Sequence, residues 1–469
     1  MFTPIMHSTN STGETFLQQC KSKRAELGPK KCQVPLPRYD FTLPDLPTEW
    51  CWASLSEICA RVSVGHVGPT SQYFTDDADG IPLVRSQDVR PGLLRLDNTL
   101  RITLEFHRKL KKSTLKSGDI LFVRVGANRG DCCVVPQGTV EINCANIVFA
   151  RPLFPNGFFG FYFRSDLAQK FLLSATTGAA QGVINTESVA RMPVPIPPLP
   201  TQEEIASILS AYDDLIENNT RRIKILEEMA QMIYREWFVD FRFPGHKEVA
   251  VVTSGGLVGP AGWERTVVER TCVSVEDGDW IETKDQGGDS YRLLQVSNIG
   301  LNAFIETDNY RFVSKETFQR LRCREVLPGD ILVARMPSPI GRAWLVTPQP
   351  WRMITAVDVA ILTPKEATSL FLLHFLNSAE TLAACSAQAS GTTRARITRR
   401  QIASVPVLLP PEEVRVRFAG IVQPVNELMD NLRNLNRTLS RTRNLLLPKL
   451  ISGEINVEQC EAVALAQGV

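Results

Sequence analysis

The sequence predicts mixed α/β (α+β) domains that are duplicated along the chain and joined by two long helices forming an antiparallel coiled coil. Two observations lead to this prediction. Short motifs recur at a nearly constant separation along the 469 residues, and each copy ends in a long segment whose apolar residues are spaced by three and four. A repeat of this length is too long for a solenoid. We therefore expect two similar globular domains related by a pseudo-two-fold axis.

The repeat is carried by motifs that reappear 211 to 213 residues further along the chain. The recurring positions are Pro47, Trp50 and Cys59 with Pro260, Trp263 and Cys272; Gly118–Leu121 with Gly329–Leu332; Arg124 with Arg335; and Pro193, Pro197 and Pro198 with Pro406, Pro410 and Pro411. The small drift in the separation indicates short insertions in surface loops. We divide the chain into an N-terminal tail (1–44), a first globular domain (45–200), a first helix (201–243), a linker (244–257), a second globular domain (258–411), a second helix (412–456) and a C-terminal tail (457–469).

Strand-like runs and proline-rich ends define the globular domains. Asp119–Val125 and Asp330–Ala334 are short, β-branched and apolar runs, which is typical of strands. Each domain then ends in prolines, at Met192–Pro198 and at Val405–Pro411. Since proline continues neither a helix nor a central strand, a boundary is expected at each of these places.

The long helices are predicted from periodicity. Thr201–Glu204 supplies a cap and an acidic first turn, and apolar residues then recur for about four heptads, which predicts a coiled coil. The first helix, from about 205 to 242, would span about 55 Å. Asn219 and Arg222 interrupt its apolar seam, either to fix the register or to face a partner. The predicted seam is Ile208, Tyr212, Leu215, Leu226, Met229 and Ile233 with Ile421, Val425, Leu428, Leu432, Leu435, Leu439 and Leu446.

Composition excludes several classes of protein. Hydrophobic residues make up 43% of the chain and charged residues 22%, a globular balance that excludes disordered and purely fibrous proteins. Eleven cysteines without a CxxC pair and five dispersed histidines predict buried thiols, without a disulfide framework or a metal site. No run of 18 apolar residues occurs and the N-terminus lacks a signal-peptide core, so a cytoplasmic location is expected.

Basic residues are concentrated in the predicted globular domains, although the whole chain carries a net charge of only +2. Between Arg101 and Asp131 there are eight Lys and Arg against three acids, and between Cys385 and Arg400 there are four Arg and no acid. Such clusters suit contacts with a polyanion, because Lys and Arg neutralise phosphates and Arg or Gln can bond to base edges. The candidate DNA-binding residues are Arg85, Lys111, Lys112, Arg124, Arg129 and Gln181 in the first domain and Gln295, Arg335, Arg342, Arg394, Arg396 and Arg399 in the second.

Several motifs in the sequence resemble those of a known protein family. Pro195–Ile205 leads into the first helix, Trp237–Phe241 closes it, and Leu445–Ile455 lies near the end of the chain. Inside the globular domains, the motifs are Gly68–Ser71, Ile81–Ser86, Ser117–Leu121 and Gly178–Ile184. Together these segments make the chain resemble, over about residues 47–456, the specificity subunit of type I restriction-modification systems.

The resemblance implies a role in sequence recognition. Each globular domain would be a target recognition domain for one half of a bipartite, gapped site in double-stranded DNA. The coiled coil would set the gap and dock two adenine-methyltransferase subunits, and restriction subunits with translocase activity would join the complex. The chain itself would be non-catalytic and without cofactors, since S-adenosylmethionine, ATP and Mg would act only in the partner subunits.

Motifs for catalysis are missing from the sequence. The two Pro-Pro pairs lack the flanking residues of an amino-methyltransferase motif, no GxxxxGK[ST] occurs, and Glu282–Lys284 matches only half of a nuclease motif. Two alternatives stay open: a single-chain DNA methyltransferase with unrecognised motifs, and a structural coiled-coil adaptor without sequence specificity. Methylation by the chain alone would favour the first, and equal affinity for every duplex the second.

Overall fold

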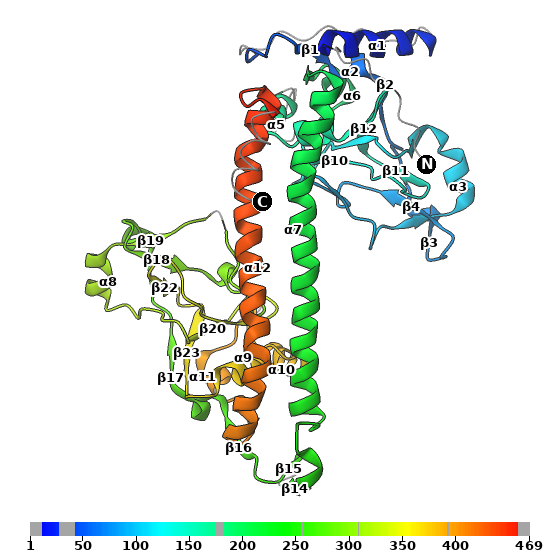
Figure 1. Cartoon of the computed structure of the whole chain (residues 1–469). Coiled ribbons are helices and arrows are strands. Elements are labelled where there is room, and N and C mark those ends of the chain that lie inside the picture. The colour runs from blue at the N-terminus through cyan, green and yellow to red at the C-terminus, as the bar shows by residue number, and fades with distance from the viewer. Residues whose placement is uncertain are drawn as a thin grey trace. The chain divides into compact units, whose positions relative to one another are not determined.

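The computed structural model describes residues 12–27, 43–174, 182–254, 257–307, 309–391 and 394–457. The chain divides into two compact units (Figure 1). Unit 1 comprises Met1–Glu217 and Arg437–Val469, and unit 2 comprises Asn218–Asn436. Each unit therefore contains one set of strands and a part of each long helix.

The described residues of unit 1 form three sheets and a separate two-stranded pair, β5 with β6. The first has the strand order β10-β9-β12-β2, the second β3-β7-β4-β11-β8, and the third pairs β1 with β13. The strands are β1 (Cys51–Ser54), β2 (Cys59–Val64), β3 (Phe74–Thr75), β4 (Ile81–Val84), β5 (Val89–Arg90), β6 (Leu93–Leu94), β7 (Arg101–Ile102), β8 (Thr114–Leu115), β9 (Ile120–Val123), β10 (Cys132–Val134), β11 (Ile142–Cys144), β12 (Ile147–Pro152) and β13 (Pro193–Ile196). The helices are α1 (Gly13–Glu26), α2 (Leu55–Ile58), α3 (Leu104–Lys109), α4 (Gly157–Tyr162), α5 (Asp166–Ser174) and α6 (Thr186–Ala190).

Unit 2 repeats this plan. Its four-stranded sheet has the order β21-β20-β23-β17, its three-stranded sheet β19-β18-β22, and β16 pairs with β24. The strands are β14 (Val251–Ser254), β15 (Leu257–Pro260), β16 (Glu264–Val267), β17 (Cys272–Asp277), β18 (Tyr291–Leu294), β19 (Phe312–Val313), β20 (Ile331–Ala334), β21 (Ala343–Leu345), β22 (Met353–Thr355), β23 (Val359–Pro364) and β24 (Pro406–Leu409). The helices are α8 (Lys315–Leu321), α9 (Ser369–Leu376), α10 (Ala379–Gln388) and α11 (Arg399–Ala403).

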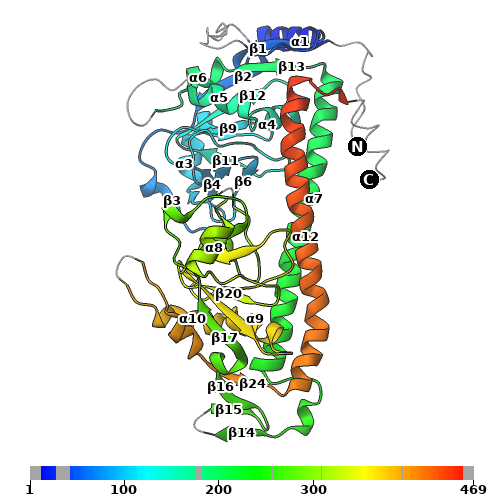
Figure 2. The same cartoon turned by 90° about the vertical axis from the view of Figure 1, so that its left-hand side faces the viewer.

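Corresponding strands pair in the same sense in the two units. The pair β4 and β11 is parallel, and so is its counterpart, β18 and β22. The central strands β9 and β20 are buried along their whole length, because alternate side chains enter clusters on opposite faces of the sheet. On one side in unit 2, α9 lies between the sheet and the long helices (Figure 2). Duplicated domains of mixed α/β class are expected to share strand order and pairing, as these two units do.

The repeated Gly-Asp-Ile-Leu motif is a turn that starts each central strand. Gly118 and Gly329 have φ of +85° and +96°, a left-handed conformation that favours glycine. The carboxylate of the following aspartate accepts a hydrogen bond from the main-chain N–H three residues earlier, at 2.8 Å for Asp119 and 2.9 Å for Asp330. The motif therefore sets where the buried strand begins.

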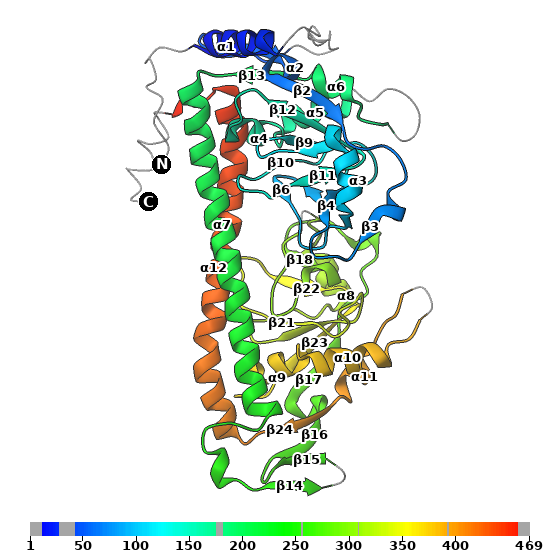
Figure 3. The same cartoon turned by 90° about the vertical axis from the view of Figure 1, so that its right-hand side faces the viewer.

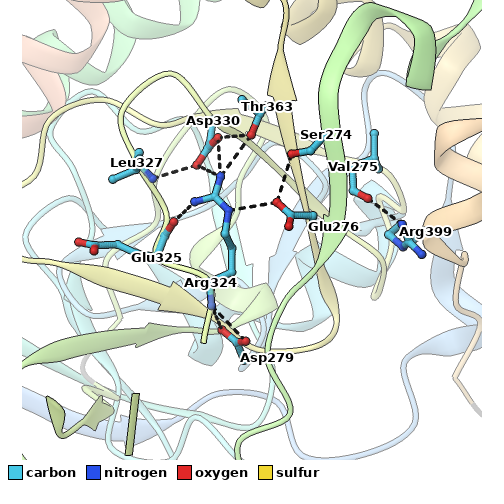
Figure 4. Close-up of polar contacts among 10 residues, drawn as sticks. All are labelled: Ser274, Val275, Glu276, Asp279, Arg324, Glu325, Leu327, Asp330, Thr363 and Arg399. Carbon is cyan, nitrogen blue, oxygen red and sulfur yellow. Dashed lines mark hydrogen bonds and ion pairs between the residues drawn. The ribbon is translucent and has the colours of Figure 1, made fainter. Parts of the chain in front are cut away.

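Each of these buried aspartates also binds a guanidinium group, but a different residue supplies it in each unit. In unit 1, Arg151 of β12 donates to Asp119 at 2.7 and 2.6 Å. In unit 2 the corresponding position of β23 is Thr363, and Arg324 donates to Asp330 at 3.1 and 3.3 Å instead (Figure 4). The same charge is thus neutralised from two different places in the sequence.

The long helices are α7 (Leu199–Tyr234), which continues into a π-helical turn at Arg235–Val239, and α12 (Glu412–Ser452). Within each unit, segments of the two helices lie side by side and run in opposite directions (Figure 1). In unit 2, Asn219 donates to Asn436 at 2.9 Å and Arg433 to Glu227 at 2.7 Å. Asn219 is thus engaged by the facing helix, whereas Arg222 is exposed.

Five of the thirteen predicted seam residues lie outside the buried rows of the helices. Leu432 is buried, and Ile208, Tyr212, Leu226, Ile233, Val425, Leu439 and Leu446 are half-buried. Leu215, Met229, Ile421, Leu428 and Leu435 are instead 39–47% exposed. The residues that follow some of them, including Ala230, Val422 and Met429, are buried in their place. A spacing of three and four fits the exposed row as well as the buried row that follows it, because the residues of both rows are apolar here.

The predicted N-terminal tail contains the helix α1. Phe16 and Cys20 on this helix are 1% and 0% exposed, and they belong to the main core of unit 1. Figure 3 shows α1 beside β13. The start of α1 lies so close to β13 that a Cβ atom on Gly13 would meet the carbonyl oxygen of Ile196 at 2.0 Å. This part of the tail is therefore an integral part of unit 1.

Two further sequence expectations concern cysteines and membranes. The nine cysteines in the described residues are free thiols, and all except Cys51 are buried. In the same residues no single helix has both the length and the apolar character to cross a membrane, and only the bent pair α9–α10 passes that test, by length and composition.

Candidate nucleic-acid interface

Loops that leave the carboxyl ends of corresponding strands position several candidate residues. Arg85 follows β4 and Gln295 follows β18, each in a turn closed by a polar side chain. The main-chain N–H of Arg85 donates to Asp88 at 2.7 Å, and that of Gln295 donates to Asn298 at 2.9 Å. Both residues are half-buried, and the Arg85 guanidinium lies 5.9 Å from the centre of the Phe74 ring. The two units thus present an Arg and a Gln from equivalent turns.

The most accessible positive charges of unit 1 follow α3. Lys111 and Lys112 are exposed on a short 3₁₀ turn, Lys111–Ser113, and neither forms an ion pair with another described residue. Arg108 and Lys116 on either side are also exposed. A cluster of cations without carboxylate partners suits a polyanion.

Arg124 and Arg129 hold a neighbouring segment of unit 1 in place. Arg124 Nε donates to the carbonyl of Ile184 at 3.2 Å, and Arg129 donates to that of Gly182 at 2.6 Å. Both side chains are half-buried, so each has part of its surface open. Gln181, which precedes this segment, lies outside the described residues.

Arg335 and Arg342 of unit 2 are buried, with exposures of 7% and 8%. Arg335 donates to the carbonyl oxygens of Ile397 at 2.9 Å and Val357 at 3.0 Å and pairs with Asp277 at 2.8 Å. Burial lowers the pKa of both guanidinium groups.

The hydrogen bonds of the Arg342 guanidinium within the described part of the chain all go to main-chain carbonyls. Its hydrogen bonds reach Ile299 at 2.6 Å, Val296 at 2.7 Å and Pro339 at 3.1 Å, together with the carbonyl of Pro337. Since the donors of Arg335 and Arg342 are directed into the protein, we reassign both side chains from DNA contact to loop positioning.

The matched pair Arg124 and Arg335 has a shared structural role. Each Nε donates to the carbonyl of an isoleucine, Ile184 or Ile397, and that isoleucine's N–H donates back to the arginine carbonyl at 3.2 or 3.1 Å. Recurrence of an arginine at this position therefore reflects the anchoring of a loop, which charge counting along the sequence cannot distinguish from ligand contact.

The remaining candidates of unit 2 lie around the start of α11. Arg394 is exposed, Arg396 pairs with Asp358 at 2.9 Å, and Arg399 pairs with Asp277 at 3.1 Å. Arg399 also donates to the carbonyl of Val275 at 2.7 Å. Neither aspartate is a predicted partner of these arginines, because Asp277 and Arg399 are 122 residues apart in the sequence.

The possible nuclease motif does not assemble into a metal site. Glu282 and Lys284 are exposed and pair with each other at 2.8 Å. Two aspartates lie upstream of this motif in the sequence. Asp277 pairs with Arg335 and Arg399, and Asp279 accepts the main-chain N–H of Arg324 at 3.2 Å (Figure 4). Among the described residues, no group of three or more His, Cys, Asp or Glu is arranged to hold a metal ion.

Comparisons with known proteins find similarity to one family of proteins. The family model described as the type I restriction modification DNA specificity domain matches residues 80–228. The type I restriction enzyme MjaIX specificity subunit of Methanocaldococcus jannaschii is 24% identical over 308 residues, covering 64% of this chain and 69% of the relative. The HindI specificity subunit of Haemophilus influenzae is 21% identical over 415 residues, covering 73% and 88%.

A solved structure shares the fold. The S subunit of a type I restriction-modification system from M. genitalium aligns with a TM-score of 0.53 and 11% identity, over 89% of this chain and 99% of that chain. Together with the family model and the curated relatives, this confirms the resemblance drawn from the sequence motifs.

Proposed function

We propose that this chain, which belongs to the specificity-subunit family of type I restriction-modification systems, is the DNA sequence-recognition subunit of such a complex. The observation that carries the proposal is the match to the DNA specificity domain within a chain whose strand order is repeated in two units. A protein with two similar units can contact two stretches of DNA at a fixed spacing.

Each unit would recognise one half of a bipartite, gapped site. Different surface residues on a shared scaffold support this division, because unit 1 exposes Lys111 and Lys112 whereas unit 2 exposes Arg394 and half-exposes Arg396 and Arg399. Arg85, Arg124, Arg129, Gln181 and Gln295 remain proposed contacts. The scaffold itself does not select a DNA sequence, whereas different surface side chains on it select different sequences.

The long helices would form the coiled coil that sets the gap between the two half-sites, with the units related by a pseudo-two-fold axis. The antiparallel contacts within each unit support this arrangement, and a helix of 36 residues such as α7 spans about 54 Å at 1.5 Å per residue. Two contacts at a fixed separation along a duplex impose a fixed helical phase.

An exposed apolar flank in unit 2 supports docking of the methyltransferase subunits on the helices. Met229, Ile421, Leu428 and Leu435 are 39–47% exposed, and the first three directly precede the buried residues Ala230, Val422 and Met429. In an antiparallel helix pair, such positions flank the same side of the interface. Large apolar side chains gathered on one exposed flank are typical of a protein-binding surface.

The chain would be non-catalytic within a cytoplasmic complex that contains two methyltransferase subunits and restriction subunits with translocase activity. S-adenosylmethionine, ATP and Mg would bind to those partner subunits. The sequence motifs for binding these cofactors are missing from this chain.

The test is to map adenine methylation on random-sequence DNA by the chain alone and together with the methyltransferase subunit of its own system. Methylation only with the partner, at one gapped two-part motif, is the expected result. Methylation by the chain alone would favour the single-chain methyltransferase, and methylation without a motif would favour a structural adaptor.

A further inference from the structure

Three arginines of unit 2 share two carboxylates at one end of a sheet. Asp277 is the last residue of β17 and binds Arg335 at 2.8 Å and Arg399 at 3.1 Å. Asp358 directly precedes β23 and binds Arg396 at 2.9 Å. Since β17 and β23 are antiparallel partners and Asp277 lies opposite Ala360, both carboxylates are at the same end of the strand pair.

The members of this group differ in accessibility. The Arg335 side chain is 8% exposed, so its pairing with Asp277 is internal. The side chains of Arg396 and Arg399 are each 36% exposed, and those of Asp358 and Asp277 are 30% and 41% exposed. Two arginines and two carboxylates therefore meet solvent together, and a bound polyanion would encounter both signs of charge.

Unit 1 lacks all four of these charges at the equivalent positions. Val183 precedes Ile184 as Arg396 precedes Ile397, and Thr186 begins α6 as Arg399 begins α11. Asn146 precedes β12 as Asp358 precedes β23. In the strand pairing, Val64 lies opposite Val148 as Asp277 lies opposite Ala360. The shared scaffold therefore folds without these ion pairs, which belong to the surface of unit 2 alone.

We propose that Asp277 and Asp358 are internal counterions that compete with DNA phosphates for Arg399 and Arg396, and thereby limit sequence-independent binding by unit 2. The inference rests on the proposed DNA-recognition function. A phosphate that approaches either arginine also approaches an aspartate, and this repulsion offsets part of the attraction. Contacts to bases are then needed to make binding favourable, so the carboxylates raise the ratio of specific to non-specific affinity.

The arrangement also affects the dependence of binding on salt. Each phosphate that a protein neutralises contributes about 0.9 to the slope of log affinity against log salt concentration. An arginine that keeps its aspartate partner neutralises less phosphate charge. Unit 2 should therefore contribute less to the salt dependence than unit 1, whose Lys111 and Lys112 have no ion-pair partner among the described residues.

The test is Asp358→Asn, because Asp277 also holds the buried Arg335 and its replacement could disturb the fold. Glu366→Gln is the matched control, because it changes the net charge by the same amount. Glu366 is exposed and lies just beyond the opposite end of β23. The affinity of the complete complex is measured by fluorescence anisotropy for the mapped target and for a scrambled duplex of equal length, at several salt concentrations.

Asp358→Asn should bind the scrambled duplex about 3- to 10-fold more tightly, with a salt slope steeper by about one, and gain less on the target. Glu366→Gln should change either affinity less than about 2-fold. Unchanged or weaker binding to the scrambled duplex by a normally folded Asp358→Asn complex would overturn the inference, as would equal gains on both duplexes. If the wild-type complex does not distinguish target from scrambled DNA, the proposed function itself fails.

Discussion

The buried aspartate at the start of the central strand pairs with Arg151 in unit 1 and with Arg324 in unit 2. We therefore predict that an arginine placed at the unit 1 position can restore the stability that unit 2 loses without Arg324. In unit 2, Arg324→Met would remove the partner of Asp330, whose side chain is 3% exposed. Breaking a buried ion pair costs about 3–5 kcal/mol, but Arg324 is 27% exposed and Asp330 keeps hydrogen bonds from Leu327 and Thr363. We therefore expect unit 2 to lose about 2–3 kcal/mol of its free energy of unfolding.

Thr363→Arg would place a guanidinium where Arg151 stands in unit 1. In the wild-type background this change adds a second cation beside Arg324 and should destabilise unit 2. In the Arg324→Met background it should supply the missing partner of Asp330 and restore stability to within about 1 kcal/mol of the wild type.

The assay is urea unfolding combined with hydrogen exchange of the β20 amides, which reports on unit 2 separately from unit 1. Each single variant and the double variant are compared with the wild type in one thermodynamic cycle. If the double variant is no more stable than Arg324→Met, the two arginines are not equivalent and the reasoning is refuted.

Three other predictions concern loop positioning, pH and docking. Arg342→Ala should destabilise unit 2 by about 3 kcal/mol in thermal unfolding because it leaves several buried carbonyls without donors, whereas the exposed Arg394→Ala should change stability by less than about 0.5 kcal/mol. Burial raises the pKa of Asp279 to about 6. The free energy of unfolding of the wild type should therefore fall by about 1 kcal/mol as the pH rises from 4 to 6, after allowance for solvent screening, and Asp279→Asn should abolish that loss. Leu428→Glu should prevent co-purification of the methyltransferase subunit without lowering the melting temperature, whereas Met429→Glu, at a fully buried position, should unfold the helix pair.

The main strands and the starts of the long helices could be predicted from the sequence because their signals are local or recur along the chain. The recurring Gly-Asp-Ile-Leu motif begins a buried central strand in both units, and the predicted helix start at 412 is also the start of α12. The start predicted at 201 lies two residues inside α7. The proline-rich ends mark both helix starts without knowledge of tertiary contacts, whereas the cap predicted at Thr201 lies inside α7.

The site was less predictable because its contacts join distant parts of the chain. The burial of Arg335 depends on Ile397, 62 residues away, and nothing near Arg335 in the sequence indicates that partner. The choice between Leu428 and Met429 as the buried residue depends on the rotation of one helix against the other. Since both are apolar, periodicity alone could not decide between them.

The contacts that hold the loops explain how one scaffold can carry two different surfaces. Arg124 and Arg335 hold their loops through the carbonyls of Ile184 and Ile397, and Arg342 holds its loop entirely through carbonyls. Every residue has a main-chain carbonyl, so such an anchor does not depend on which side chains the loop presents. The surface side chains of each unit can therefore differ, as Val183 differs from Arg396, while the strand order and the loop anchors stay the same. Separate surfaces on a common frame are the physical requirement for two half-sites of unlike sequence.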